Sequence, residues 1–297
     1  MDRITMLGTG HAMVQQCFNT CFVYETECGK MLVDTGGGNG ILKQMQQAGI
    51  SMQEIDAVFI THQHTDHLMG LPWLFRSVGG PGASGKITFF MHEELMKTAV
   101  GMLELLFSDD FSRQKEQAEF VTVKNGDTAE IIGRKFTFFD TFSPTVTQYG
   151  FIVELGDGRR LTFHGDTPFD EKNRQILEGN QILMHEAFNL ESEGFGGPGG
   201  LGGPGGPGGP GEPGGPGGPG GPGGPGGLKV KKGGPGHSTV KQAATYGQSL
   251  KAKTLILVHG SDNDLEQRKE KYSLEASTAF DGEIYVPDDL DVITINS

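Results

Sequence analysis

Four residues of types that bind transition metals, His62, His64, Asp66 and His67, stand close together in the sequence. They form the pattern His-x-His-x-Asp-His directly after the apolar run Ala57–Ile60. Neutral imidazoles and a carboxylate suit zinc or a similar first-row metal, and two clusters at this spacing can hold two adjacent ions. We expect His62 and His64 to project together from the end of a strand, while Asp66 and His67 turn into a following helix.

Short apolar runs alternate with helical stretches along the chain, which predicts a mixed α/β protein. Turn signals such as Asn125-Gly126-Asp127 separate the predicted strands. The predicted helices are Gly40–Gln47, His92–Leu106, Glu171–Leu177, Ser238–Leu250 and Asp264–Thr278. The predicted strands are Ile4–Leu7, Cys21–Tyr24, Lys30–Asp34, Asp56–Thr61, Lys86–Met91, Lys135–Asp140, Phe151–Leu155, Arg160–His164, Gln181–His185, Thr254–His259, Glu283–Val286 and Asp291–Ile295.

At the metal-binding motif the chain resembles the metallo-β-lactamase superfamily, and three further motifs follow in that superfamily's order. The resemblance implies that Asp34 supports the metal-binding loop, that Asp166 bridges both metals, and that His259 is the last ligand. Alone, an aspartate or histidine after a strand is more often a turn or packing residue. The implied fold is an α/β, four-layer αβ/βα sandwich of two mixed sheets flanked by helices. The implied metal ligands are His62, His64, Asp66, His67, Asp166 and His259.

Within that superfamily the chain is similar to ribonuclease Z, the tRNA 3′ processing endonuclease. The similarity rests on Met6-Leu7-Gly8-Thr9-Gly10, Leu68-Met69-Gly70-Leu71-Pro72, His185-Glu186-Ala187-Phe188 and Gly236-His237-Ser238-Thr239. It implies that Glu186 orients His237, which donates a proton to the leaving oxygen, and that Asp66 orients or deprotonates the nucleophile. Without the resemblance, Glu186 is more readily explained as a buried, hydrogen-bonded strand carboxylate. His237 is then a histidine that precedes a helix cap.

The chain departs from the family pattern at one metal ligand. A further histidine should precede Tyr149-Gly150, but the stretch from Asp140 to Gln148 contains none, and Phe142 or Pro144 stands there. The first metal site is therefore one protein ligand short, and His164 is a candidate replacement because, two residues before Asp166 at the end of the predicted strand Arg160–His164, it could face the same side as Asp166. We expect two zinc ions, the first weakly held or absent, with manganese or iron as alternatives.

A second departure concerns the substrate. Ribonuclease Z enzymes usually carry a protruding arm that grips tRNA, and here the stretch from Gly150 to Gly165 leaves room only for a hairpin. The formal net charge of −13 also opposes non-specific binding to nucleic acid. Both features favour a smaller phosphodiester over a tRNA precursor.

One low-complexity block interrupts the chain. Gly196–Gly227 has glycine at every third position, mostly in Gly-Gly-Pro triplets, and we expect a solvated polyproline-like or disordered loop rather than a collagen trimer. Residues 1–297 are otherwise predicted to form a single metallo-β-lactamase-like hydrolase domain.

The remaining composition bears on the compartment. The three cysteines, Cys17, Cys21 and Cys28, cannot all pair within the chain, which favours a reducing compartment, the cytoplasm. No apolar run of about 18 residues or secretion signal is present, so we expect a soluble protein without a membrane partner. A homodimer is a candidate assembly.

Three functional hypotheses follow. The first is a ribonuclease Z-like phosphodiesterase, whose phosphodiester substrate is a tRNA precursor or a small molecule. The second is a hydrolase of the same superfamily that acts on a small ester, lactone or cyclic nucleotide. The third is a degenerate, non-catalytic metal-binding relative, which the missing histidine favours.

Overall fold

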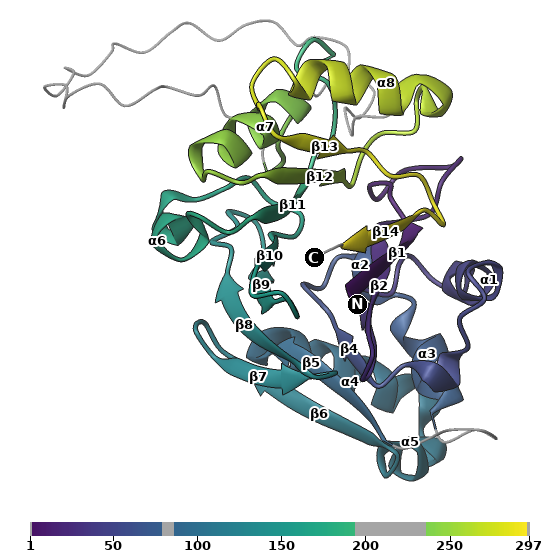
Figure 1. The fold of residues 1–297 in the computed structure, drawn as a ribbon. Coiled ribbons are helices and arrows are strands. Elements are labelled where there is room, and N and C mark those ends of the chain that lie inside the picture. Colours follow the sequence, from purple (N-terminus) through teal and green to yellow (C-terminus); the bar gives the residue numbers. More distant parts are fainter. Residues whose placement is uncertain (1, 79–85, 194–235, 296–297) are drawn as a thin grey trace, which may run out of the picture.

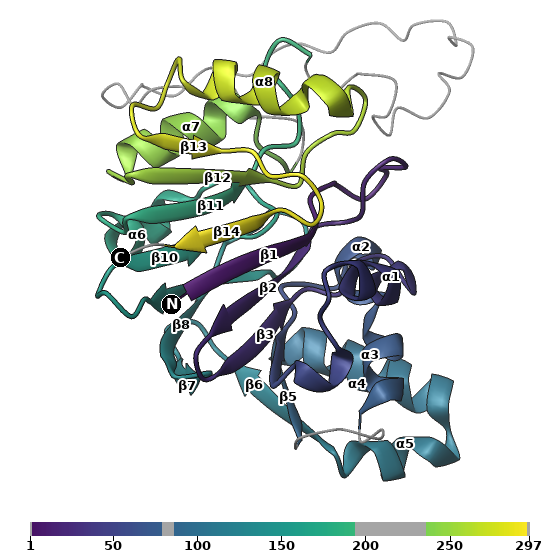
Figure 2. The ribbon, with the colours of Figure 1, turned by 45° about the vertical axis from the view of Figure 1, so that its right-hand side comes forward.

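Two mixed sheets packed face to face make up the centre of the molecule (Figures 1 and 2). The computed structural model describes residues 2–78, 86–193 and 236–295. Helices cover the outer face of each sheet, so the predicted αβ/βα sandwich is confirmed. The loop predicted at Gly196–Gly227 lies outside the described residues.

The first sheet has the order β14-β1-β2-β3-β4-β5-β6. Strands β3 to β6 are parallel, whereas β14, β1 and β2 pair antiparallel, so that the last strand of the chain lies beside the first (Figure 1). Its strands are β1 Asp2–Gly8, β2 Cys21–Thr26, β3 Gly29–Val33, β4 Ala57–Phe59, β5 Ile87–His92, β6 Ala118–Val123 and β14 Val292–Ile295.

The second sheet has the order β13-β12-β11-β10-β9-β8-β7. Strands β10 to β13 are parallel, and β7 to β10 form an antiparallel meander. Its strands are β7 Thr128–Ile131, β8 Arg134–Asp140, β9 Tyr149–Glu154, β10 Arg160–Phe163, β11 Ile182–Glu186, β12 Thr254–Val258 and β13 Glu283–Tyr285.

The helices divide between the two outer faces. Helices α1 Gly40–Gln47, α3 Leu71–Ser77, α4 Glu93–Phe107 and α5 Asp109–Lys115 pack on the first sheet. Helices α6 Arg174–Leu177, α7 Val240–Ser249 and α8 Leu265–Ala276 pack on the second, α7 and α8 lying along β12 and β13 (Figure 1). Short helices α2 Thr65–Leu68, η1 Met52–Glu54 and η2 Glu171–Asn173 complete the described set. Among these helices, none is long and apolar enough to cross a membrane.

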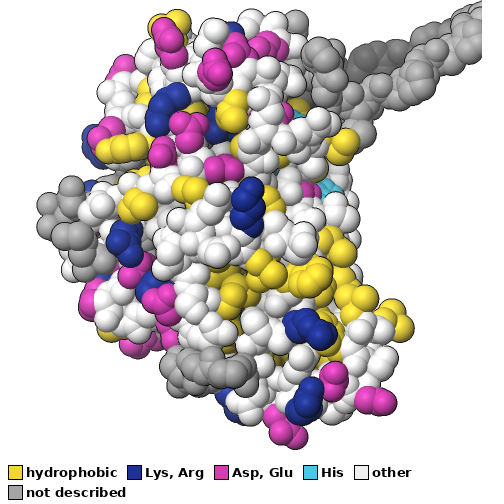
Figure 3. Space-filling model, turned by 90° about the vertical axis from the view of Figure 1, so that its right-hand side faces the viewer, with side chains coloured by type: hydrophobic (Ala, Val, Ile, Leu, Met, Phe, Trp, Pro, Cys, Tyr) yellow, Lys and Arg dark blue, Asp and Glu magenta, His cyan; other side chains and the backbone are white. Residues whose placement is uncertain are grey.

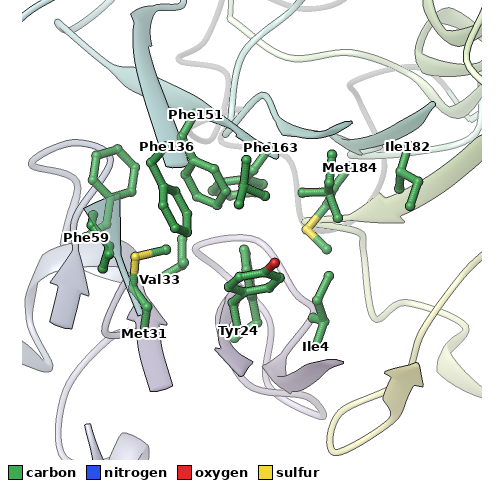
Figure 4. Close-up of a cluster of buried hydrophobic side chains, with 14 of the residues drawn as sticks. Ile4, Tyr24, Met31, Val33, Phe59, Phe136, Phe151, Phe163, Ile182 and Met184 are labelled. Carbon is green, nitrogen blue, oxygen red and sulfur yellow. The ribbon is translucent and has the colours of Figure 1, made fainter. Parts of the chain in front are cut away.

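Aromatic side chains fill the space between the sheets. Phe59 of the first sheet contacts Phe151 of the second edge to face, with ring centroids 5.6 Å apart, and Phe22 contacts Phe163 at 5.0 Å in the same way. All four rings are buried, and Figure 4 shows Phe59, Phe151 and Phe163 within this cluster. Edge-to-face pairs add to the free energy of burying the rings, so this layer holds the two sheets in fixed register.

The predicted pattern missed several elements. Strands β6 and β7 and helices α3 and α5 were not predicted. Strands β6 and β7 are edge strands with half-exposed, partly charged sequences, so they lack an apolar run. Helix α3 buries Leu71, Leu74 and Phe75, but its seven residues are too few for a helical period to stand out, and α5 carries a single buried side chain.

The aromatic contacts give a stability prediction. We expect Phe151→Ala to lower the free energy of unfolding by about 3–5 kcal/mol, because a buried ring is replaced by a cavity. Leu105→Ala on α4 is the control: its side chain is 85% exposed, and we expect a change within about 0.5 kcal/mol. Urea unfolding of both variants tests this, and similar losses would show that Phe151 does not join the sheets.

Candidate metal centre

The functional side chains lie where parallel strands of both sheets end. Asp34 follows β3, the metal-binding loop follows β4, Asp166 follows β10, Glu186 ends β11 and His259 follows β12. Asp34 and His259 have positive φ angles of 57° and 58°, a conformation that non-glycine residues rarely adopt and that turns the chain sharply after each strand. The carboxyl ends of these strands thereby bring ligands from distant segments together.

The loop after β4 departs from the predicted strand. We predicted a strand to Thr61, but β4 ends at Phe59, and His62 and His64 lie in the loop that leads into α2. Their rings nevertheless meet, because His62 Nε2 lies 2.8 Å from His64 Nδ1. Asp66 and His67 lie on α2, as predicted.

One group of four candidate ligands is buried. Asp66, His67, Asp166 and His259 each offer an atom within 4.8 Å of the others. His67 Nε2 lies 3.3 Å from Asp66 and 3.5 Å from Asp166, and His259 Nδ1 lies 3.2 Å from Asp166. His67 Nε2 and His259 Nδ1 nevertheless have no hydrogen-bond partner. Apart from a 3.4 Å hydrogen bond between His259 Nε2 and Asp66 Oδ2, these buried polar atoms converge without bonding to each other, which fits a metal ion between them.

A second group of four, Asp166, Glu186, His237 and His259, shares Asp166 and His259 with the first. The third group is smaller. His62, His64 and Asp166 converge, with His62 Nε2 3.7 Å from Asp166 Oδ2, and within the described residues no fourth ligand joins them. Phe142, which with Pro144 is one of the two residues at the expected place of the missing histidine, has its ring 4.4 Å from Lys172 Nζ in a cation–π contact. The residues fit a metal in the group around Asp66 and His67 and in this group of three, with fewer protein ligands at the group of three.

His164 does not replace the missing ligand. It lies outside the ligand groups in the described part of the chain, and its ring stacks on that of His185 at 4.8 Å, against Phe139 and Phe169. The inference that it faces Asp166 is wrong, because Gly165, with φ +82°, turns the chain between them. Side chains alternate along β10, so His164 follows Thr162 to the helical face while Phe163 enters the core.

Asp34 supports the loop from beneath. Its carboxylate accepts hydrogen bonds from the backbone N–H of Thr61 at 2.8 Å and from the Thr61 hydroxyl at 3.0 Å. The other oxygen lies 2.8 Å from His67 Nδ1, which fixes Nε2 as the nitrogen that faces the ligand group. Thr61 was not predicted to take part, and its place directly before His62 was the only signal.

His237 is held by two carboxylates. Its Nδ1 lies 2.8 Å from Glu186 Oε2 and 2.9 Å from Asp166 Oδ1. The other oxygen of Glu186 accepts the N–H of Ser238 at 2.8 Å. Burial by itself lowers the pKa of His237, but Asp166 and Glu186 outweigh it and raise that pKa to about 11. Both carboxylates thus favour the protonated ring, and since they hold Nδ1, Nε2 is the nitrogen left to donate.

The carboxylates and histidines of the four-ligand group balance one another. Burial alone lowers the pKa of His67, but Asp66 and Asp34 raise it well above its usual value. Burial alone raises the pKa of Asp66, but His67 and His259 hold it far below its usual range. The group therefore carries two buried carboxylates whose charge a cation can balance.

His11 also reaches this site and was not predicted. Its ring is buried, with its centroid 6.3 Å from that of His259. Burial, with His259 nearby, lowers the pKa of His11 to about 4. Its only signal in the sequence was its place directly after Gly8-Thr9-Gly10.

Known proteins resemble the chain along most of its length. A family model described as anti-Pycsar protein Apyc1 matches residues 2–194. The anti-Pycsar protein Apyc1 of Saccharibacillus brassicae is 38% identical over 68 residues, covering 23% of this chain and 27% of that protein. The ribonuclease Z of Methanothermobacter thermautotrophicus is 23% identical over 342 residues, covering 100% of this chain and 98% of the relative.

Solved structures share the fold. The metallo-β-lactamase fold protein YhfI of Bacillus subtilis superposes with a TM-score of 0.71 at 15% identity, covering 99% of this chain and 100% of that one. The short form of human tRNase Z superposes with a TM-score of 0.67 at 21% identity, with the same coverage. The predicted resemblance to the superfamily and to ribonuclease Z is confirmed.

The unequal ligand groups give a prediction about metal content. After loading with zinc or manganese and gel filtration, we expect His64→Ala to keep the ion of the four-ligand group and Asp166→Ala, which removes the shared ligand, to keep none. Elemental analysis measures the bound metal. Asp157→Ala, at the exposed β9–β10 turn, is the control and should match the unmodified chain. Equal metal content in all variants would contradict the ligand assignment.

The buried histidine pair gives a pH prediction. Burial lowers the pKa of His185 to about 4, so between pH 6.5 and 4 the unfolded chain binds a proton there that the folded chain does not. Stability therefore falls as the pH falls through this window. We expect His185→Asn, without bound metal, to weaken this dependence by up to about 1.4 kcal/mol per pH unit. Urea unfolding of the unmodified chain and of His185→Asn at pH 7, 6 and 5 tests this. If the free energy of unfolding depends on pH equally in both, folded His185 binds its proton as the unfolded chain does.

Proposed function

The chain belongs to the anti-Pycsar protein Apyc1 family, and from this premise we propose that it is a metal-dependent phosphodiester hydrolase. One arrangement carries the proposal: the ligand groups around Asp166 lie directly beside His237, whose Nδ1 is held by Glu186. Ligands for two cations beside a proton donor suit hydrolysis of a phosphodiester.

Each candidate site residue has a distinct role in the proposed hydrolysis. His62, His64, Asp66, His67, Asp166 and His259 would hold the ions. When bound, divalent ions of this kind neutralise charge on phosphate oxygens and lower the pKa of water. Zinc suits the imidazole and carboxylate ligands, and manganese and iron are the alternatives. Asp66 orients or deprotonates the nucleophile from its place in the four-ligand group.

His237 serves as the general acid. Glu186 and Asp166 hold Nδ1, so the ring cannot turn that nitrogen toward substrate, and a proton on Nε2 is available to the leaving oxygen. The Glu186 carboxylate is itself fixed by the N–H of Ser238. Glu186 is therefore a positioning residue for His237 in this proposal.

The substrate proposed first is a phosphodiester that reaches the site without a gripping arm. Strands β9 and β10 are joined by the tight turn 155–159, in which the Leu155 N–H donates to the Arg159 carbonyl at 2.8 Å. On the face shown in Figure 3, Lys and Arg side chains are scattered among acidic ones and form no continuous basic surface. The formal net charge of −13 likewise opposes binding of a long, negatively charged RNA. These observations favour a small ester or a cyclic nucleotide over precursor tRNA, which stays the alternative.

Further proposals concern the whole protein. The three cysteines are free thiols, Cys21 buried and Cys28 exposed, which supports a reducing compartment such as the cytoplasm. We also propose that residues 1–297 work as one hydrolase domain, since β11 and α7, on either side of the Gly/Pro block, join the same layers. A homodimer is the assembly to test by light scattering.

The general-acid role can be tested by the leaving group. We expect His237→Ala to lower turnover of an alkyl or ribose phosphodiester roughly 10²- to 10⁴-fold with metal content unchanged. Turnover of bis(p-nitrophenyl) phosphate should change little, because nitrophenolate departs without a proton. Thr245→Ala, on the exposed face of α7, is the control.

Other outcomes decide between the hypotheses. Equal losses on both substrates would assign His237 a positioning role, and loss of metal would make it a ligand. Turnover of cyclic nucleotides but not of precursor tRNA supports the small-substrate proposal, and the reverse supports processing of tRNA. Metal binding without turnover of any phosphodiester supports the non-catalytic relative.

A further inference from the structure

Three aromatic rings form a column beside the metal centre. The ring of His11 stacks on Phe188 with centroids 4.3 Å apart and planes 24° apart. The ring of His237 stacks on Phe188 at 4.7 Å and 26°. On one face of Phe188 the two imidazoles would also contact each other, and the structure, which describes both residues, shows no ring contact between His11 and His237, so the phenyl ring lies between them.

The His11 end of the column is fixed by hydrogen bonds to its ring and backbone. The N–H of Met13 donates to His11 Nδ1 at 3.1 Å, which leaves His11 neutral with its proton on Nε2. The His11 N–H donates to the Gly260 carbonyl at 3.2 Å, and Asn19 donates to the His11 carbonyl at 2.9 Å. The His11 ring is therefore held from the loop after β1, on the sheet opposite to that of Phe188 and His237.

The middle of the column is fixed by its backbone. The Phe188 N–H donates to the Ser238 carbonyl at 2.9 Å, next to His237. The Phe188 carbonyl accepts from the Ser261 N–H at 3.0 Å and from the Tyr272 hydroxyl at 3.0 Å. Phe188 thus joins the segments that carry Glu186, His237 and His259, and with both faces covered its ring cannot serve as a platform for a base.

The hydrogen bond to Glu186 alone leaves one motion of His237 open. A ring held only at Nδ1 can still tilt about that bond, which moves Nε2 sideways. A flat ring packed against the imidazole removes this tilt, and that ring is in turn backed by His11.

We propose that His11 is a positioning residue which, through Phe188, sets the plane of the His237 imidazole so that Nε2 faces the leaving oxygen. The inference rests on the proposed function for its catalytic consequence, but the ring geometry does not. No contact between His11 and substrate is needed, because the effect passes through the stacked phenyl ring.

Two substitutions at one position test the proposal. His11→Ala removes the ring, and His11→Phe keeps a ring but removes both nitrogens. We expect His11→Ala to lower kcat on an alkyl phosphodiester about 2- to 12-fold, the loss of one stacked pair, with KM and metal content unchanged. Turnover of bis(p-nitrophenyl) phosphate should stay unchanged in His11→Ala. In His11→Phe, most of the lost kcat on the alkyl phosphodiester should be restored. Met13→Ala, at an exposed side chain in the same loop, is the control.

A spectroscopic readout separates this inference from the proposed function. In protein labelled with ¹⁵N-histidine, the Phe188 ring current shifts the ring protons of His237, and we expect these signals to move or broaden in His11→Ala and to return in His11→Phe. Unchanged His237 signals in His11→Ala overturn the proposal. So does a His11→Phe variant as impaired as His11→Ala, because His11 would then act through a nitrogen. If the unmodified chain hydrolyses no phosphodiester, the proposed function fails. The His237 signals then test by themselves whether His11 sets the plane of the His237 ring.

Discussion

The burial of carboxylates among histidines is the constraint on which the rest of the structure depends. Asp34, Asp66, Asp166 and Glu186 are all buried, at 0%, 5%, 7% and 0% exposure. A buried carboxylate is tolerated only when hydrogen bonds or opposite charges compensate for the lost water. Here histidines compensate each of them, and Asp166 lies beside four: His62, His67, His237 and His259.

Such a cluster requires a rigid support, and the sandwich provides it. The ligands come from loops on both sheets, so any sliding of one sheet against the other would separate them. The aromatic layer that joins Phe59 to Phe151 and Phe22 to Phe163 resists that sliding. Histidines on the helical face of the second sheet have a different role, since His164 and His185 pack as uncharged rings.

The two departures from the family pattern act on different parts of the molecule. Loss of the histidine near Phe142 leaves one ligand group short without disturbing the buried group of four, which keeps its own ligands. The tight 155–159 turn joins β9 and β10 directly, and the two strands beneath it keep a regular antiparallel register. The arrangement of the metal centre is thus compatible with the smaller substrate proposed above.

The sequence by itself determined the ligand types, the order of the motifs and most strands and helices, because these follow from local spacing and apolar periodicity. The helix Gly40–Gln47 was predicted with its observed bounds, and the superfamily fold followed from motif order. The edge strands β6 and β7 were not predicted from the sequence, because polar, half-exposed residues interrupt their apolar ones. Only the tertiary structure decided that His164 turns away from Asp166, since one left-handed glycine reverses the direction that spacing suggests. It alone placed His11 behind Phe188, because stacking between segments far apart in the chain depends on how the sheets pack, which no local pattern records.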